Sequence, residues 1–331
     1  MKKSPLHSVP SLILPLLLST FGLLLPGSTA LAQPQVPTAV SVSGSENYHF
    51  PYRMNQPEQT FELPEKLVEI SGLSLTGTPL DQLAVIQDEQ GIVFFIDKDS
   101  GEVLRELSFG KDGDYEGIEV VGEDVYIVKS SSKIYHIKKF GHAEQSVVKY
   151  STPLTKEYDV EGLAYDRRQH ALLLACKGEP QTDNSDPSDQ KRFTRAVYRF
   201  PLQTHQLDTV PVMAINREDI LEYFKNHPPL LKVDKDGEIK ESNPEKLKCY
   251  PSAIAIHPHT GNYYVSSSKG KVLFVVSPRG QLLHLEKLDK RIHPQPEGLA
   301  FEEDGTLYVS NEGRDGPGRI YRFAYQKLKN Q

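Results

Sequence analysis

Three glutamates stand at the same point of a short phrase that recurs along the chain, in which Glu is followed by Gly and an apolar residue. They are Glu116, Glu161 and Glu297. Two weaker copies of the phrase carry serine instead, at Ser71 and Ser252. Carboxylate oxygens are the ligands that hard cations such as Ca²⁺ prefer, and clustered carboxylates can also exchange protons. The sequence therefore offers a candidate site, provided that the fold brings the three glutamates together.

The position after each Glu or Ser sets a regular spacing. Aligned there, the chain steps by 45, 45, 91 and 45 residues through Gly72, Gly117, Gly162, Ala253 and Gly298. A fixed period of this size is typical of arrays of blades or stacked repeats. Most repeats hold four short strand-like stretches separated by Gly- and Asp-containing turns, which is typical of a β-propeller blade. We predict an all-β propeller in which the phrase opens the strand lining the central tunnel.

The step of 91 residues decides the number of blades. Near residue 207 the chain has no glycine and no matching pair of strands. Asn216 instead resembles a helix cap, and Ile220 and Tyr223 fall on one face of the helix that would follow. We therefore predict five four-stranded blades with a helix-containing insertion at 214–248. Six blades are the alternative.

The two ends of the repeat region complement each other. The chain leaves little room for a fourth strand after Phe323, and the strand-like segment 59–63 has no blade of its own. Pairing of 59–63 with 318–324 would complete the last blade, close the ring and remove exposed strand edges. The predicted propeller spans 58–325, with a C-terminal tail at 326–331.

The first 32 residues have the pattern of a secretory signal peptide. Lys2 and Lys3 precede an interrupted apolar run, and small residues follow up to Ala32. This pattern predicts cleavage after Ala32 and a periplasmic or secreted protein. Residues 33–57 are predicted to be a linker or a segment that lies on the surface. The alternative is a retained membrane anchor, although the run is short for a span of about 30 Å.

Charge excludes some partners. Removing residues 1–32 takes away two lysines and no acid, so the net charge moves from −6 to −8. A chain with this acidic balance has no basic field to attract phosphates, which disfavours nucleic acid as a partner. The expected partner is an envelope protein or a small ligand, and a membrane only if the signal segment is retained.

In a propeller blade the first two strands are antiparallel, so the start of one lies beside the end of the other. Residues at the ends of the second strands and in the adjacent loops should therefore surround the glutamates at one tunnel mouth. The predicted metal ligands are Glu116, Glu161 and Glu297, with Ca²⁺ as the possible cofactor. The predicted ligand-binding residues around them are Ser71, Asp88, Asp114, Lys129, Lys177, Ser252, Asn311 and Glu312.

Mutual repulsion makes such a ring costly. Three carboxylates about 8 Å apart at an effective dielectric constant near 20 repel by about 2 kcal/mol per pair, or about 6 kcal/mol in all. A bound cation, salt bridges to Lys129 and Lys177, or a raised pKa on one carboxyl would each offset this. Alternatively, the glutamates simply accept backbone N–H bonds from neighbouring blades and hold the ring together.

Two weaker signals remain. Cys176 and Cys249 both fall at the glutamate end of adjacent blades, so a disulfide between them is possible in an exported protein. His257 and His259 fall in a turn at the opposite end of the tunnel, where a turn is a better interpretation than a metal pair.

The glutamate phrases in the second, third and fifth units, the serines in the first and fourth, and the export signal resemble the SdiA-regulated propeller proteins over about residues 60–325. The phrase is also similar to that of phytase-like and lactonase-like propellers. The first resemblance implies a fold and no reaction. We therefore predict an exported binding module with a cation or ligand at the glutamate mouth. The alternative is a metal-dependent phosphoesterase or lactonase, in which Glu312 or Asp114 would activate water.

Overall fold

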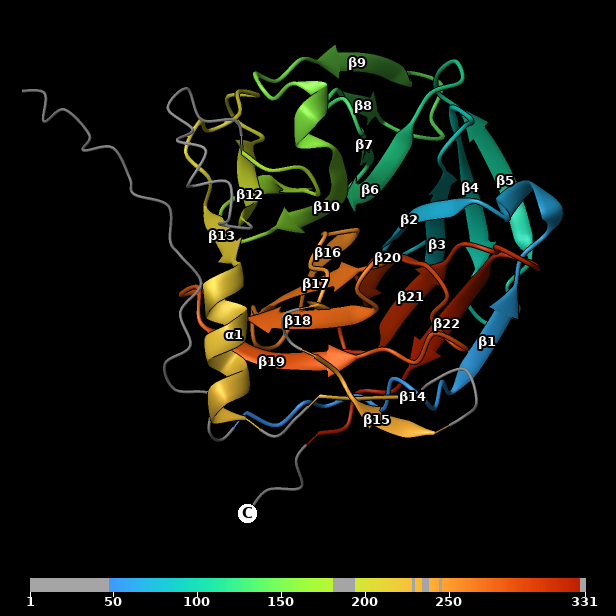
Figure 1. Ribbon diagram of the computed structural model, residues 1–331. Coiled ribbons are helices and arrows are strands. Elements are labelled where there is room, and N and C mark those ends of the chain that lie inside the picture. The colour runs from blue at the N-terminus through green and yellow to red at the C-terminus, as the bar shows by residue number, and fades with distance from the viewer. Residues whose placement is uncertain (1–47, 181–193, 228–229, 234–237, 244–245, 328–331) are drawn as a thin grey trace, which may run out of the picture. The chain divides into compact units, whose positions relative to one another are not determined.

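Five four-stranded antiparallel sheets stand in a ring in the computed structural model (Figure 1). The structure describes residues 48–180, 194–227, 230–233, 238–243 and 246–327. The prediction of a five-bladed all-β propeller is confirmed. Every tunnel strand begins at or within one residue of the recurring phrase, so the repeat in the sequence is the repeat in the fold.

Each blade runs from the tunnel to the rim in chain order. Blade 1 is β2 (Ile70–Leu75), β3 (Gln82–Gln87), β4 (Ile92–Asp97) and β5 (Val103–Ser108); blade 2 is β6 (Tyr115–Val121), β7 (Asp124–Lys129), β8 (Ile134–Lys138) and β9 (Ser146–Tyr150). Blade 3 is β10 (Val160–Asp166), β11 (Ala171–Cys176), β12 (Thr194–Pro201) and β13 (Met213–Asn216); blade 4 is β16 (Ala253–Ile256), β17 (Tyr263–Ser267), β18 (Val272–Val276) and β19 (Leu282–Lys287). Two short 3₁₀ helices, Glu65–Leu67 and Lys156–Tyr158, precede β2 and β10.

Blade 5 joins the two ends of the propeller. Its strands from the chain's C-terminal part are β20 (Pro296–Phe301), β21 (Leu307–Asn311) and β22 (Arg319–Phe323). The fourth is β1 (Gln59–Glu62), which pairs with β22 from Gln59 opposite Arg322 to Glu62 opposite Arg319. The predicted closure by an N-terminal strand is confirmed, and the ring therefore has no open blade.

The glycine that follows Glu or Ser in the recurring phrase, which we call the register glycine, lets the tunnel strands approach one another closely. A Cβ on Gly72 would lie 2.9 Å from the backbone of Glu116, Gly117 and Ile118 on the next blade. Outside this inner ring, one apolar cluster fills each of the five junctions between neighbouring blades. Burial between blades, with close backbone contact at the axis, holds the ring together.

The predicted insertion follows blade 3. Helix α1 (Arg217–Asn226) begins after Asn216 and buries Ile220 and Tyr223, as the pattern predicted. It contacts β13 and β19, the outermost strands of blades 3 and 4, and Figure 1 shows it at the edge of the ring. A small hairpin of β14 (Leu231–Val233) and β15 (Ile239–Glu241) comes next. The helix thus lies at the rim.

The segment before the propeller contributes to its packing from residue 48 onward. Tyr52 and Met54 are buried in the junction between blades 4 and 5. The predicted signal peptide and the first part of the predicted linker lie outside the described residues. Within the described ranges, the helices are too short or too polar to cross a membrane.

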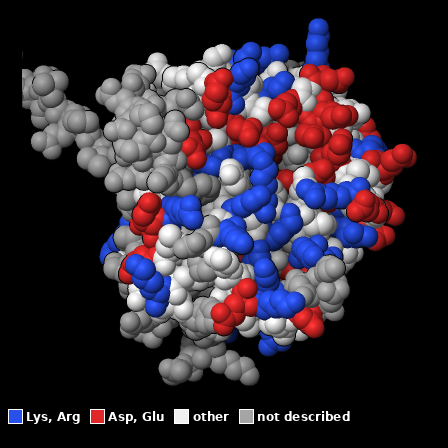
Figure 2. All heavy atoms as spheres, in the orientation of Figure 1, with Lys and Arg blue, Asp and Glu red and all other residues white. Residues whose placement is uncertain are grey.

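Charge is unevenly spread over the surface. Figure 2 shows Lys and Arg side chains gathered across the middle of the face in view, with Asp and Glu concentrated toward the upper right. A net charge of −6 over the full chain therefore hides a local basic region.

Candidate functional site

The three glutamates are placed by a shared irregularity of the tunnel strands. The pairing of β6 with β7 shifts between Tyr115 and Gly117, which leaves Glu116 as the extra residue of a β-bulge. The same shift occurs around Glu161 in β10 and around Glu297 in β20. A bulge interrupts the ladder and redirects a side chain, and bulges are frequent beside functional sites.

These bulges bring Glu116, Glu161 and Glu297 to one small recess, which we call the glutamate mouth. Its volume is about 10 Å³, close to the minimum for one water-sized particle. Below the glutamates, each tunnel strand contributes one apolar side chain that is at most 5% exposed: Leu73, Ile118, Leu163, Ile254 and Leu299. The recess therefore has polar walls, an apolar floor and room for a single small particle.

Burial makes all three carboxyls reluctant to ionise. It raises the pKa of Glu116 to about 10, with additional repulsion from Glu161, Asp114 and Glu297. Burial also raises the pKa of Glu297 to about 8, aided by Glu161 and Glu312 and opposed by Lys177 and a hydrogen bond with Ser268. The expected electrostatic cost of the ring thus takes the form of raised pKa values.

Lys177 is the cation that the mouth already contains. Its Nζ contacts the Glu161 carboxylate and lies 3.6 Å from Asp159 Oδ2. Burial raises the pKa of Glu161, and Lys177 opposes this, which leaves the value at about 7. The salt bridge predicted for Lys177 is therefore present.

Lys129, predicted to act alongside Lys177, has a different environment. Its Nζ lies 4.9 Å from the centre of the Tyr115 ring, an arrangement typical of a cation–π contact. Asp114 accepts a hydrogen bond from Ser130 and faces Glu116 closely enough to raise its pKa. Asp114 therefore belongs to the mouth, whereas the ammonium of Lys129 is directed to an aromatic ring.

The two serines of the phrase are buried. Ser252 Oγ donates to the carbonyl of Pro296 on blade 5 at 2.7 Å and accepts from the backbone N–H of Ser268 at 3.1 Å. The carbonyl of Ser71 accepts from Ser310 Oγ at 2.8 Å, again between blades. The serine positions in blades 1 and 4 thus join neighbouring blades.

Asn311 presents an unused acceptor at the same end of the tunnel. His293 Nε2 is 2.9 Å from the carbonyl of Met54, so it carries the proton and Nδ1 is an acceptor. Asn311 Nδ2 lies 3.4 Å from that Nδ1, which assigns the amide orientation and leaves Oδ1 buried without a hydrogen-bond partner. Asn311 is paired with Pro296, directly before Glu297.

Asp88 and Glu312 extend the acidic groups between blades 5 and 1. Asp88 Oδ1 is also buried without a partner, and burial, with repulsion from Glu69 and Glu312, raises the pKa of Asp88 to about 6. Glu312 accepts a hydrogen bond from Gln295 Nε2, and burial raises its pKa as well. Two acceptor oxygens at this end therefore have no donor, which is costly unless a ligand supplies one.

As the side chains stand, the described residues contain no group of three or more His, Cys, Asp or Glu close enough to hold a metal ion. With Lys177 in contact with Glu161, a cation would have to displace the ammonium and draw the carboxylates inward. The oxygen donors that line the recess and fit a hard cation are those of Glu116, Glu161 and Glu297.

The possible disulfide is not formed. Cys176 and Cys249 are both free and buried. Cys176 packs in the junction of blades 2 and 3, whereas Cys249 packs in the junction of blades 3 and 4 against α1. The two residues share one end of the propeller, but their side chains enter different apolar clusters.

Sequence reasoning missed a further acid, Glu119, which is partly buried. Two residues beyond the register glycine, the other four blades have Ser74, Ala164, Ala255 and Ala300. Glu119 accepts hydrogen bonds from Ser74 Oγ at 2.9 Å and from the backbone N–H of Tyr165 at 3.2 Å. An acid at a position otherwise held by small residues was the signal that could have identified it.

Comparisons with known proteins agree with this architecture. A family model described as SdiA-regulated matches residues 52–324. A luciferin-regenerating enzyme aligns at 15% identity and a TM-score of 0.47, covering 83% of this chain and 100% of that one. A glutaminyl cyclase from Myxococcus xanthus aligns at 12% identity and a TM-score of 0.49, covering 83% of this chain and 97% of that one. Comparison with curated sequences found no match.

Proposed function

The chain belongs to the SdiA-regulated family, and we propose that it is an exported binding module that holds one divalent cation, such as Ca²⁺, at the glutamate mouth. One observation carries this proposal: three glutamates, each displaced by a β-bulge, line a single recess with room for one ion. The cation would either complete the mouth structurally or join the protein to a ligand.

Electrostatics supports a cation at this position. Three carboxyls that resist ionisation because of burial and mutual repulsion gain most from a nearby positive charge. In the absence of a metal, protons and Lys177 supply the neutralising charge.

The hydrogen bonds of Asp114 and Glu312, the two acids that could activate water in a hydrolase, favour binding over hydrolysis. Asp114 accepts from Ser130, and Glu312 accepts from Gln295. Each acid that would have to activate water is thus already a hydrogen-bond acceptor. The geometry gives no separate support for a hydrolytic reaction, so we retain binding as the proposed function.

Isothermal titration calorimetry of the metal-free protein with CaCl₂ tests this proposal. We expect one ion per chain with a Kd of about 1 mM or tighter, the range of extracellular Ca²⁺ modules or better. The triple variant Glu116→Gln, Glu161→Gln, Glu297→Gln should retain the shape of the recess and lose the binding.

Glu106→Gln on the rim strand β5 is the matched control, because it removes an exposed carboxylate far from the tunnel and should leave Ca²⁺ binding unchanged. Absence of stoichiometric binding in the wild type, or equal binding in the triple variant, would overturn the cation proposal. Melting curves of all variants establish that they are folded.

A further inference from the structure

The opposite end of the tunnel contains a larger cavity that the proposed function does not use. Its volume is about 310 Å³, and it is lined by the ends of the tunnel strands and the turns that follow them. Along each lining strand, the residues of the glutamate mouth come first, then the buried apolar ring, and then the cavity. The cavity, which we call the opposite mouth, is thus separated from the glutamate mouth by packed apolar side chains.

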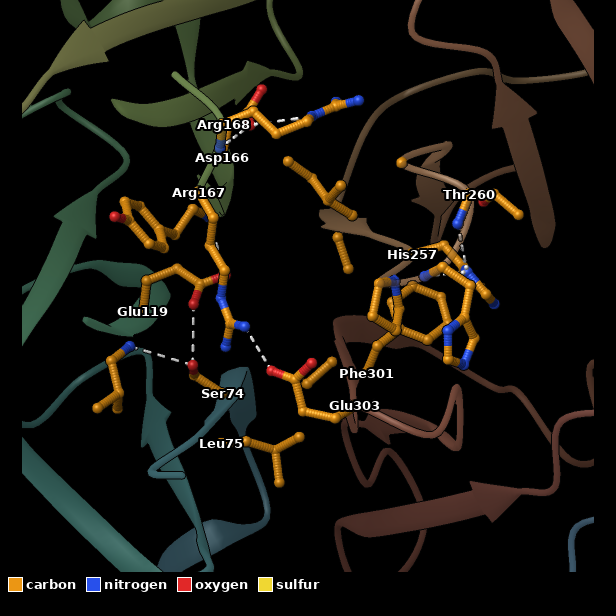
Figure 3. A pocket seen from close by; sticks show the side chains of 18 residues that line it. Ser74, Leu75, Glu119, Asp166, Arg167, Arg168, His257, Thr260, Phe301 and Glu303 are labelled. Carbon is orange, nitrogen blue, oxygen red and sulfur yellow. Dashed lines mark hydrogen bonds and ion pairs between the residues drawn. The ribbon is translucent and has the colours of Figure 1, made fainter. Parts of the chain in front are cut away.

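One wall of the opposite mouth carries Glu119 (Figure 3). Burial raises the pKa of Glu119 to about 7, while hydrogen bonds from Ser74 and Tyr165 oppose the shift. The corresponding residues Ala255 and Ala300 also line the cavity, where their small side chains leave it open. A buried carboxyl beside open space is a binding group for an incoming cation or hydrogen-bond donor.

The facing wall carries His257 with Phe301 (Figure 3). His257 is only 1% exposed, and its Nδ1 accepts from the backbone N–H groups of His259 at 3.3 Å and Thr260 at 3.4 Å. The proton of the neutral ring is therefore on Nε2, which is buried without a hydrogen-bond partner. The ring packs against Tyr264, Phe301 and Tyr325, so its Nε2 has almost no exposed surface. The group that this wall offers to a ligand is therefore the Phe301 ring.

Arg167 lies beside Glu119 on the first wall (Figure 3), where its charge opposes the raised pKa of that carboxyl. Figure 3 shows its side chain reaching from the end of β10 to Glu303 after β20, where the two form an ion pair. Both side chains are about three-quarters exposed, at 75% and 73%, so this pair contributes little and can open at small cost. When this ion pair opens, the guanidinium of Arg167 is available to an anionic group inside the cavity.

We propose that the opposite mouth is a second ligand site, for a small free amino acid. The carboxylate of the ligand accepts from Arg167, its ammonium is bound by Glu119, and its side chain packs against Phe301. The groups match in number and sign, because Arg167 and Glu119 lie close together on one side of the cavity and Phe301 lies on the other (Figure 3). The α-carboxylate and α-ammonium of an amino acid sit on one carbon, so neighbouring groups of opposite charge can bind both. The volume lies at the lower end of small-molecule sites.

Three aromatic probes separate the parts of this proposal. L-phenylalanine has the carboxylate, the ammonium and a ring; phenylacetate lacks the ammonium, and phenethylamine lacks the carboxylate. In saturation-transfer NMR and calorimetry we expect L-phenylalanine to bind at millimolar concentration or below and each truncated probe to bind about tenfold more weakly or worse.

Variants then locate the binding. Arg167→Ala and Glu119→Gln should each weaken L-phenylalanine about tenfold or more, and Ala300→Phe should abolish binding by filling the cavity. Arg279→Ala, which removes another exposed arginine in a turn of blade 4, should have no effect. Glutamine at 119 can still accept the Tyr165 N–H bond at Oε1 and can donate from Nε2 to Ser74 Oγ, so this variant does not depend on a change of fold.

The proposal is overturned if L-phenylalanine does not bind to the wild type at about 10 mM, or if it binds Arg167→Ala and Ala300→Phe as well as the wild type. Phenylacetate binding equal to that of L-phenylalanine would overturn the role of Glu119. Because the glutamate mouth is not involved, Ca²⁺ binding in these variants should match the wild type whatever the outcome.

Discussion

Calcium binding at the glutamate mouth should release protons, because the cation needs carboxylates that the metal-free protein keeps largely protonated. At pH 7, carboxyls with pKa values of about 10, 8 and 7 hold roughly two protons between them. The three groups titrate together, so we expect between one and two protons released per ion. Affinity should therefore rise about 10- to 100-fold per pH unit between pH 6 and pH 8.

Calorimetry in buffers of different ionisation enthalpy measures the proton count directly. Titrations in phosphate-free buffers at one pH give observed enthalpies whose slope against buffer enthalpy is the number of protons released. Glu116→Gln removes the carboxyl with the most raised pKa and should lower this number by about one. A slope near zero, or an affinity that does not change with pH, would refute the account of the mouth given above.

The same pKa values set the stability of the metal-free protein. A carboxyl whose pKa is raised by folding contributes stability that is complete below its unfolded value, near 4.5, and is lost as the pH rises through the folded value. The melting temperature of the metal-free chain should accordingly fall between pH 6 and pH 9. Saturating CaCl₂ should reduce or reverse this fall, since the ionised carboxylates then have a partner.

Three further predictions concern single features of the fold. Lys177→Met removes the competing ammonium and should tighten Ca²⁺ binding by about tenfold. The ammonium of Lys129 faces Tyr115 instead, so Lys129→Met should change Ca²⁺ binding by less than about twofold. Equal effects of the two variants in calorimetry would contradict the assignment. Phe61→Ala in the closing strand should lower the unfolding free energy by about 3–5 kcal/mol in urea titrations, because Phe61 is buried between blades 5 and 1, and a loss below about 1 kcal/mol would show that the strand is dispensable. Reducing agent should leave the melting temperature unchanged, since Cys176 and Cys249 are free, and a drop of several degrees would reveal a disulfide.

The blades could be predicted from the sequence because their spacing is tied to a steric requirement. Tunnel strands pack so closely that a Cβ at Gly72 or Gly298 would contact backbone or side-chain atoms of a neighbouring strand within 3 Å. Glycine, or alanine in blade 4, must therefore recur at one point of every blade. The closing strand could be predicted for a similar reason, since an unfinished last blade requires a partner for its edge.

The details of the site depend on side-chain choices that spacing does not determine. Lys129 and Lys177 stand at or just beyond the ends of equivalent strands, yet only Lys177 pairs with a glutamate, because the ring of Tyr115 attracts the other. The possible disulfide is not formed for a similar reason, because two cysteines at one end of the ring can still face different junctions. The opposite mouth was missed because Glu119 and Arg167 come from different blades, and the spacing of the repeat does not show that they lie side by side (Figure 3).

The restriction of glutamate to three of the five blades follows from the electrostatic cost. Only Glu116 and Glu161 stand on neighbouring blades. At about 2 kcal/mol for that pair and less for the two diagonal pairs, three carboxylates repel by about 5 kcal/mol, which a single divalent cation or two protons can offset. Five would form ten pairs, and even with the longer diagonal distances the repulsion would reach about 15 kcal/mol, the upper end of the net stability of a domain. Serine in blades 1 and 4 avoids that cost, and Ser252 uses its position for a hydrogen bond to the next blade. The number of glutamates is thus limited by this electrostatic cost rather than set by the five-fold repeat of the fold.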